Sequence, residues 1–108
     1  MDYKTIGIDV SKTSLDICFL PTGEYLQISN DINGFKQLKK HIGSVKVDKI
    51  LMESTGSYHR SLQKFLNIAG FKVFVINPKQ IRDFAKACGI LAKTDKIDAQ
   101  VIAQFGER

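Results

Sequence analysis

Three strand-like runs separated by short polar turns restrict the fold of this chain more than any other feature. Residues 5–10 alternate apolar side chains with small or polar ones, the period of two that is typical of a strand with one buried face. Residues 15–20 and 24–29 also have the composition of strands, and only a few turn-forming residues separate the three runs. Connections this short join antiparallel neighbours, so we expect three antiparallel strands in the first third of the chain.

The rest of the chain alternates helix-like and strand-like segments. Residues 49–53 and 71–76 are short apolar runs of strand length. Around them, apolar residues recur at helical spacing in four sets: Ile32, Phe35, Leu38 and Ile42; Tyr58, Leu62, Phe65, Leu66 and Ala69; Ile81, Phe84, Ala85 and Cys88; Ile97, Val101 and Phe105. Strand–helix–strand units require parallel pairing and right-handed crossovers. The order β-β-β-α-β-α-β-α-α therefore predicts an α/β fold, a mixed sheet with helices on both faces.

Residues suited to helix ends stand at the expected boundaries. Side chains that can cap a helix precede all four helical segments: Asn30 or Asp31, Ser57, Asn77 and Thr94. Glycine follows the first three segments, as is common at helix C-termini: Gly43, Gly70 and Gly89. Pro78 also stands at the first position of the third helix, where its missing N–H costs nothing. These boundary residues agree with the four helices predicted from the spacing.

The composition is that of a single soluble globular domain. The 108 residues suffice for one hydrophobic core, 44% of them are hydrophobic and 25% are charged, and no run approaches the ~18 apolar residues that a membrane span requires. The N-terminus has no basic segment leading into an apolar one, so it does not resemble a signal peptide and we expect a cytoplasmic protein. The net charge of +5 weakly favours a polyanionic partner such as DNA or RNA.

The remaining reactive side chains have simple structural explanations. Cys18 and Cys88 have no His or Cys near them at metal-ligand spacing, so we expect buried free thiols rather than a zinc site or a disulfide. His41 and His59 are expected to be solvated helix residues, although His59 follows the fourth strand closely enough to reach a phosphate or a metal-bound water. Ser57 is interpreted as a helix cap, because a nucleophilic serine needs a base and an oriented partner.

Four carboxylates occupy positions that the predicted fold can bring together. Asp9 lies near the end of the first predicted strand, one residue before Val10, and Glu53 ends the fourth. Functional groups gather at the carboxyl ends of parallel strands. Asp95 and Asp98 are three residues apart in a predicted helix, which places them on the same side of it. Each acid alone has a structural explanation as a turn or helix-start residue. A cluster of four calls for a cation, and hard divalent ions such as Mg²⁺ or Mn²⁺ take oxygen ligands.

A site of this kind suits phosphoryl transfer, in which two ions ~4 Å apart can activate an attacking oxygen and stabilise a leaving one. Six basic residues, most of them in the segment that delivers the two aspartates, are candidates for contacts with a phosphate backbone: Lys12, Lys79, Arg82, Lys86, Lys93 and Lys96. Each of them alone is equally well explained as part of a solvated surface. We expect any binding of DNA or RNA by these residues to be weak, largely independent of sequence and steeply dependent on salt.

The sequence resembles the insertion-sequence transposases of the Piv and MooV family, the DEDD transposases. The resemblance is carried, in order along almost the whole chain, by residues 7–12 (GIDVSK), 53–59 (ESTGSYH), 77–78 (NP) and 84–99 (FAKACGILAKTDKIDA). It implies an RNase H-like fold akin to the RuvC-type Holliday-junction resolvases. It also implies a four-acid site whose catalytic residues and ligands to Mg²⁺ or Mn²⁺ are Asp9, Glu53, Asp95 and Asp98.

The resemblance further implies what the chain does and what else it needs. Family members catalyse metal-dependent phosphoryl transfer on DNA during transposition of an insertion sequence. They continue into a second domain with a serine thought to attack DNA, so we expect residues 1–108 to be one domain of a longer protein and to be inactive in strand transfer alone. A structured guide RNA and a homo-oligomeric assembly are implied for the full-length protein.

Two other interpretations fit parts of the sequence. The opening Ile-Gly-Ile-Asp at residues 6–9 is also found in sugar kinases and actin-like ATPases, but residues 10–12 lack the glycine that usually follows the aspartate there. A non-catalytic nucleic-acid-binding domain would use the lysines and leave the acids as caps of turns and helices. Tight binding of ATP would favour the first alternative, and failure to bind Mg²⁺ or Mn²⁺ would favour the second.

Overall fold

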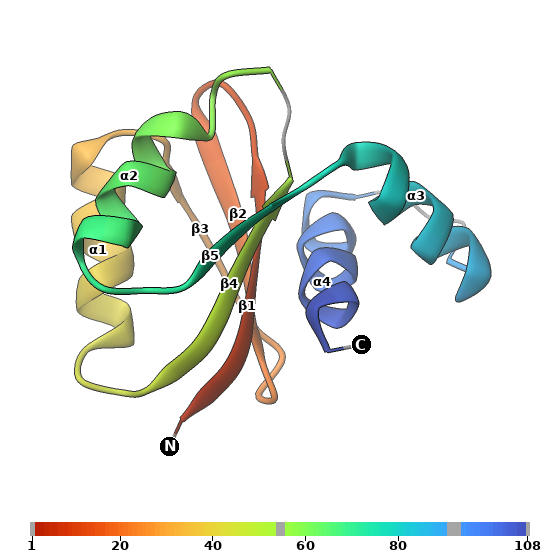
Figure 1. Cartoon of the computed structure of the whole chain (residues 1–108), viewed down its shortest axis with the longest axis horizontal. Helices are drawn as coiled ribbons and strands as arrows, with labels where there is room; N and C mark the ends of the chain where they lie inside the picture. The colour runs from red at the N-terminus through yellow and green to blue at the C-terminus, as the bar shows by residue number, and fades with distance from the viewer. Residues whose placement is uncertain (1, 54–55, 91–93, 108) are drawn as a thin grey trace.

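The computed structural model of the chain describes residues 2–53, 56–90 and 94–107, with the side chain of Asp95 left aside. Its elements follow one another in the predicted order (Figure 1): β1 (Tyr3–Val10), β2 (Ser14–Leu20), β3 (Glu24–Ser29), α1 (Ile32–Ile42), β4 (Val47–Glu53), α2 (Arg60–Ile68), β5 (Val73–Ile76), α3 (Pro78–Ala87) and α4 (Asp95–Gly106). Among the described residues, no helix is long and apolar enough to cross a membrane.

The five strands form one mixed sheet in the order β3-β2-β1-β4-β5. β1 pairs with β2, and β2 with β3, in antiparallel fashion, whereas β1 with β4 and β4 with β5 are parallel. The short turns thus give the antiparallel half of the sheet and the helical crossovers give the parallel half, as predicted. Because β1 and β4 are neighbours and parallel, their carboxyl ends lie side by side at one edge of the sheet (Figure 1).

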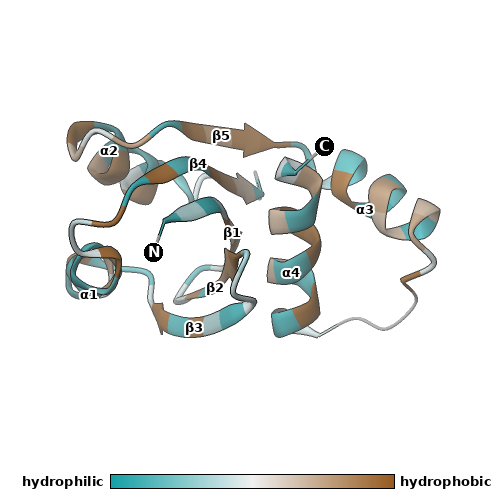
Figure 2. Ribbon diagram, turned by 90° about the horizontal axis from the view of Figure 1, so that it is seen from below, coloured by the Kyte–Doolittle hydropathy of each residue, from teal (hydrophilic) through white to brown (hydrophobic). Residues whose placement is uncertain are grey.

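Helices cover both faces of the sheet (Figure 2), which confirms the predicted α/β architecture. α1 and α2 pack on one face, where Ile6, Ile8 and Val10 of β1 belong to the main hydrophobic core. α4 covers the other face, where Leu51 of β4 packs with Ile102 of α4 in a second core, and α3 packs against α4. Successive side chains of a strand point to opposite faces. The residues of β1 that alternate with its isoleucines, including the acid at its carboxyl end, therefore face α4.

Helix α4 lies very close to β1, and small residues make this approach possible. A β carbon added at Gly7 would lie 2.3 Å from the backbone nitrogen of Ala103 and 2.6 Å from the carbonyl oxygen of Ala99. The two alanines and Cys18 are fully buried in a cluster between the helix and the sheet. This packing seats α4 against the sheet with its N-terminal end toward the edge where β1 and β4 end (Figure 1).

Helix α2 begins later than the sequence predicts. It starts at Arg60, and residues 56–59 before it form turns. His59 occupies the N-cap position without a side-chain hydrogen bond, so the interpretation of Ser57 as the helix cap is wrong. The carbonyl oxygen of Ser57 instead accepts a hydrogen bond from the backbone N–H of Arg60 at 3.2 Å.

Three residues of the predicted apolar helix stripes are exposed: Ile32, Tyr58 and Cys88. Ile32 is the first residue of α1 and is 51% exposed. Tyr58 is 46% exposed, because it lies in the turn before α2. The Asn30 side-chain amide holds it there by donating to the Tyr58 carbonyl oxygen at 3.0 Å. Cys88 occupies the C-cap of α3, one residue after the helix ends, and is exposed. The prediction of two buried thiols is therefore wrong for Cys88 and confirmed for Cys18, which is fully buried.

Candidate metal centre

Asp9 and Glu53 lie side by side where β1 and β4 end. The parallel register pairs Ile8 with Met52, which directly precede the two acids. Side chains alternate along a strand, so both acids face the α4 side of the sheet. The two carboxyl groups are close enough that Glu53 raises the pKa of Asp9. The structure thus brings together the two acids that end the predicted strands.

Helix α4 carries the other two predicted acids to the same edge. The Thr94 hydroxyl caps the helix as predicted, by accepting a hydrogen bond from the N–H of Ile97 at 3.2 Å. Asp98, one turn further, is close enough to Asp9 for its negative charge to raise the pKa of Asp9. Asp95 is the first residue of α4, and its side chain lies outside the described part of the chain.

The acidity of Asp9 is strongly perturbed. Its pKa is raised from 3.8 to about 7, first by burial, then by the negative charges of Glu53 and Asp98, by the hydrogen bond with Glu53 and by the charge of Asp16. The metal-free carboxyl of Asp9 therefore keeps its proton to a higher pH than an ordinary aspartate does. A divalent cation among these carboxylates would replace repulsion by attraction. The donor set accordingly fits a hard cation such as Mg²⁺ or Mn²⁺.

Asp9, Glu53 and Asp98 are called the acidic cluster below. Among the described side chains, no group of three or more aspartates, glutamates, histidines or cysteines is arranged to hold a single ion. Asp95, the fourth predicted ligand, does not belong to those side chains. The cluster is thus an open set of oxygen donors, and its fit to a cation rests on the chemistry of those donors and on the raised pKa of Asp9.

We expect the metal-free protein to be more stable at pH 5 than at pH 8 because of Asp9. A carboxyl whose pKa is higher in the folded chain stabilises the fold fully below its unfolded value of 3.8, and this contribution is lost as the pH rises through about 7. Solvent screens the partly exposed group, so we expect a change of about 1–2 kcal/mol. Denaturant titrations in chelator at several pH values should show a free energy of unfolding that falls as the pH rises in the wild type. The fall should be smaller in Asp9→Asn. Equal slopes would rule out Asp9 as its source.

The structure adds a fifth acid that the sequence analysis missed. Asp16 of β2 is the cross-strand partner of Asp9 and is only 3% exposed. Its carboxylate accepts hydrogen bonds from the Tyr25 hydroxyl and, at 3.0 Å, from the Gln27 side-chain amide, both on β3. The Asp16 carboxylate thus has two hydrogen-bond donors, whereas Asp9 lies among other acids that raise its pKa. The available signal was a carboxylate inside the apolar run 15–20, but only the strand register shows which residue it faces.

The basic residues predicted to contact nucleic acid occupy different places. Lys96, in the first turn of α4, places its ammonium 5.9 Å from the centroid of the Tyr25 ring. Lys12 is exposed in the turn after β1, and Lys93 lies outside the described residues. The exposed side of α3 carries three more: Lys79, Arg82 and Lys86. In the sequence, Lys12 follows Asp9 by three residues and Lys96 precedes Asp98 by two. Helix α3, with its three basic residues, lies beside α4 (Figure 1).

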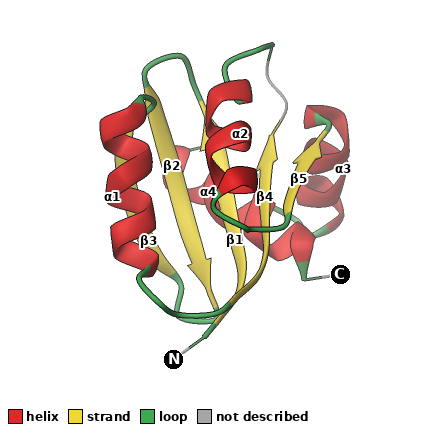
Figure 3. Ribbon diagram, turned by 60° about the vertical axis from the view of Figure 1, so that its left-hand side comes forward, coloured by secondary structure: helices red, strands yellow, loops and turns green. Residues whose placement is uncertain are grey.

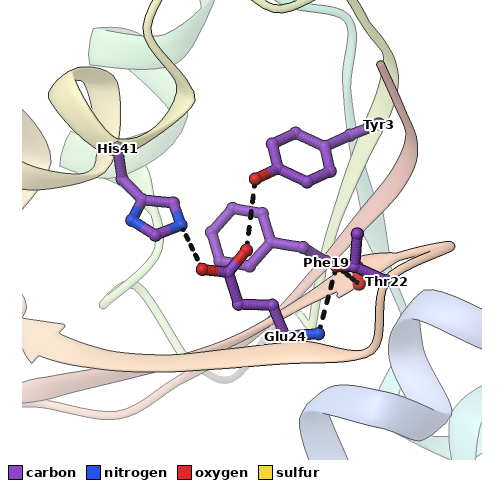
Figure 4. Close-up of polar contacts among 5 residues, drawn as sticks. All are labelled: Tyr3, Phe19, Thr22, Glu24 and His41. Carbon is purple, nitrogen blue, oxygen red and sulfur yellow. Dashed lines mark hydrogen bonds and ion pairs between the residues drawn. The ribbon is translucent and has the colours of Figure 1, made fainter. Parts of the chain in front are cut away.

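The two histidines have separate surroundings. The Nε2 atom of His41 lies 2.9 Å from a carboxylate oxygen of Glu24, and its ring is 4.8 Å from that of Phe19. The Tyr3 hydroxyl donates to the other Glu24 oxygen at 3.2 Å (Figure 4). These residues gather beside the β2–β3 turn, at the opposite end of the sheet from the acidic cluster. His59 is partly buried rather than solvated, and its Nδ1 has no hydrogen-bond partner among the described residues.

Comparison with known proteins gives the relatives and the family of this chain. Two relatives, the pilin gene-inverting proteins of Moraxella bovis and Moraxella lacunata, are each 33% identical to the chain over 114 aligned residues. The alignments cover all of this chain and 35% of each relative, so the chain spans about a third of their length.

Among solved structures, T. thermophilus RuvC in complex with a Holliday junction substrate superposes on the chain with a TM-score of 0.63. The match has 13% sequence identity and covers 92% of this chain and 88% of that one. It shows the RNase H-like, RuvC-like fold that the resemblance implied. The sequence profile of the IS110-type DEDD family, described as a transposase, matches residues 6–108. Since this match takes in nearly the whole chain, the chain belongs to the IS110-type family of DEDD transposases.

Proposed function

We propose that this chain is the metal-dependent catalytic domain of a DNA transposase and transfers phosphoryl groups on DNA during transposition of an insertion sequence. The observation that carries the proposal is the acidic cluster at the ends of two parallel strands, with the pKa of Asp9 raised to about 7. Such a cluster is costly without a cation. Membership of a transposase family and the relatives' name, pilin gene-inverting protein, support DNA as the substrate.

The proposal gives each group of residues a role. Four acids would hold Mg²⁺ or Mn²⁺, as two ions: Asp9, Glu53, Asp95 and Asp98. Ions held there would supply positive charge to stabilise the negative charge that develops on phosphate oxygens. Asp16, held by Tyr25 and Gln27, keeps a fixed carboxylate beside Asp9. The basic residues of the turn after β1, of α3 and of α4 hold the DNA backbone through its phosphates.

Further parts of the activity are proposed for a longer protein. The resemblance assigns the attack on DNA to a serine in a second domain, so residues 1–108 alone are not expected to perform strand transfer. Homo-oligomer formation and association with a structured guide RNA are likewise proposed for the full-length protein, acting in the cytoplasm. The alignments with the two relatives cover 35% of each relative's length.

The proposal predicts that a divalent ion changes how the acidic cluster acts on DNA. Without metal, the carboxylates repel phosphates, whereas bound ions attract them. At constant ionic strength, millimolar Mn²⁺ should tighten the binding of a short DNA duplex to the wild-type chain about tenfold, as measured by fluorescence anisotropy. In the absence of Mn²⁺ the binding should be weak and steeply dependent on salt.

Two variants make this experiment specific. Asp9→Asn removes a ligand at the centre of the acidic cluster and should lose most of the enhancement by Mn²⁺. Asp48→Asn removes an exposed acid of β4 that lies outside the cluster, so it should keep the full enhancement. An equal effect of Mn²⁺ on the wild type and on Asp9→Asn would reject the proposed function.

A further inference from the structure

A concave surface adjoins the edge of the sheet that carries the acidic cluster, but on the opposite face of the sheet. A hollow of about 620 Å³ opens between the beginning of α1 and helix α2, which lie on the same face of the sheet (Figure 3). Phe35 and Phe65 form part of its lining, with their ring centroids 5.5 Å apart. A hollow of this volume is in the range of small-ligand sites, so a single nucleotide can enter it.

Most of the exposed large apolar side chains gather at this hollow. Four are exposed among the described residues: Ile32 (51%), Tyr58 (46%), Ile68 (77%) and Phe74 (49%). The first three line the hollow, whereas Phe74 lies on the α4 side of the sheet. Single exposed apolar residues are ordinary, but a group of them around one hollow indicates a surface that contacts a partner.

The charge around the hollow complements a polyanion. Lys12 and Lys64 line it, and Arg60 lines an adjoining hollow together with Lys64. Asp31 is the one acid among the described lining residues, and its carboxylate already caps α1 by accepting the N–H of Gly34 at 2.9 Å. An aromatic and aliphatic floor with cations beside it suits a nucleic-acid base with its flanking phosphates.

Part of the wall of the hollow is formed by the segments that follow β1 and β4, the strands that carry Asp9 and Glu53. Lys12 follows Asp9 by three residues, and Tyr58 follows Glu53 by five. The side-chain amide of Asn30 donates one hydrogen bond to the carbonyl oxygen of Tyr58 at 3.0 Å. It donates another to the carbonyl oxygen of Ser11, in the β1–β2 turn, at 2.9 Å. These two bonds tie the segment after β4 to the turn after β1, so the wall of the hollow is preformed beside the acidic cluster.

We infer that this hollow binds an unpaired nucleotide of the DNA on which the acidic cluster acts, an inference that rests on the proposed function. The base stacks on Tyr58 and contacts Ile32 and Ile68, while Lys12 and Lys64 bind the flanking phosphates. Every base has a face that can stack, so the hollow does not select a sequence. A base within a duplex cannot reach the ring, so the hollow selects DNA that has a base outside the helix.

The test compares two DNA duplexes that differ by one unpaired adenine, with affinities measured by anisotropy in chelator. The wild type should bind the duplex with the unpaired base about tenfold more tightly. Tyr58→Ala should lose this preference and change the affinity for the paired duplex by less than about twofold. Tyr58→Phe should keep the preference, because its ring still stacks. Phe74→Ala removes an equally exposed aromatic ring on the other face and should leave the preference intact.

Three results would overturn the inference. The first is equal affinity of the wild type for both duplexes, and the second is an equal loss of preference in Phe74→Ala and Tyr58→Ala. The third is a dimer of the DNA-free chain in sedimentation that Ile68→Asp disperses, since the hollow would then join two copies of the chain. Failure here is distinguishable from failure of the proposed function, because the preference is measured without metal and the Mn²⁺ effect on paired DNA depends on Asp9.

Discussion

Replacement of Gly7 by alanine is expected to destabilise the protein by about 3 kcal/mol or more. The new β carbon would lie 2.3 Å from the backbone nitrogen of Ala103 and 2.6 Å from the carbonyl oxygen of Ala99. Both are backbone atoms of α4, so rotation of a side chain cannot relieve the overlap and the helix has to move away from β1. Denaturant unfolding of the metal-free protein measures the loss.

Gly106→Ala is the matched control, because it adds the same methyl group at the other end of the interface. Its β carbon would meet side-chain atoms instead, Cδ1 of Leu51 at 2.5 Å and Cγ2 of Thr5 at 2.7 Å. The Leu51 side chain can shift, and alanine is favoured over glycine in a helix by up to ~1 kcal/mol. The loss should therefore be clearly smaller than in Gly7→Ala. A Gly7→Ala variant as stable as the wild type would contradict the close packing of α4 against β1 at Gly7.

Local patterns predict the parts of the site that lie at the ends of single elements. Asp9 is the last residue but one of the alternating run 5–10, and Glu53 ends the apolar run 49–53. The parallel pairing of β1 with β4 places these two strand ends together. The topology is predictable for a related reason: the length of a connection decides between antiparallel and parallel pairing. The cap at Thr94 is predictable because its hydrogen bond spans only three residues.

Features that depend on strand register or on distant contacts escape such patterns. Asp16 faces Asp9 only through the pairing of β1 with β2. Tyr58 fits a helical stripe by spacing, but the hydrogen bond from Asn30, far away in the sequence, holds its carbonyl in a turn. Cys88 has the right spacing for the inner face of α3, but the helix ends one residue earlier and leaves the thiol exposed.

Asp98→Asn is expected to raise the melting temperature in chelator and to lower it, relative to the wild type, in Mn²⁺. In chelator, the charge of Asp98 is one of the causes that raise the pKa of Asp9, so its removal relieves repulsion on the order of 1 kcal/mol. Millimolar Mn²⁺ binds the folded site and not the unfolded chain. At one hundred times the dissociation constant it would stabilise the wild type by about 2.7 kcal/mol, and a variant that lacks a ligand by much less.

Two further variants separate this explanation from a purely helical role. Asp95→Asn should show the same reversal if Asp95 shares the site, whereas Asp83→Asn, which removes an exposed acid of α3, should show none. An acid that only complements the N-terminal end of α4 behaves in the opposite way, because the helix dipole favours a negative charge there. Its replacement by asparagine would then be neutral or destabilising in chelator, and Mn²⁺ would shift the melting temperatures of wild type and variant alike. That pattern would remove Asp95 and Asp98 from the metal site and leave Asp9 and Glu53 as a pair of strand-end acids without a partner on the helix.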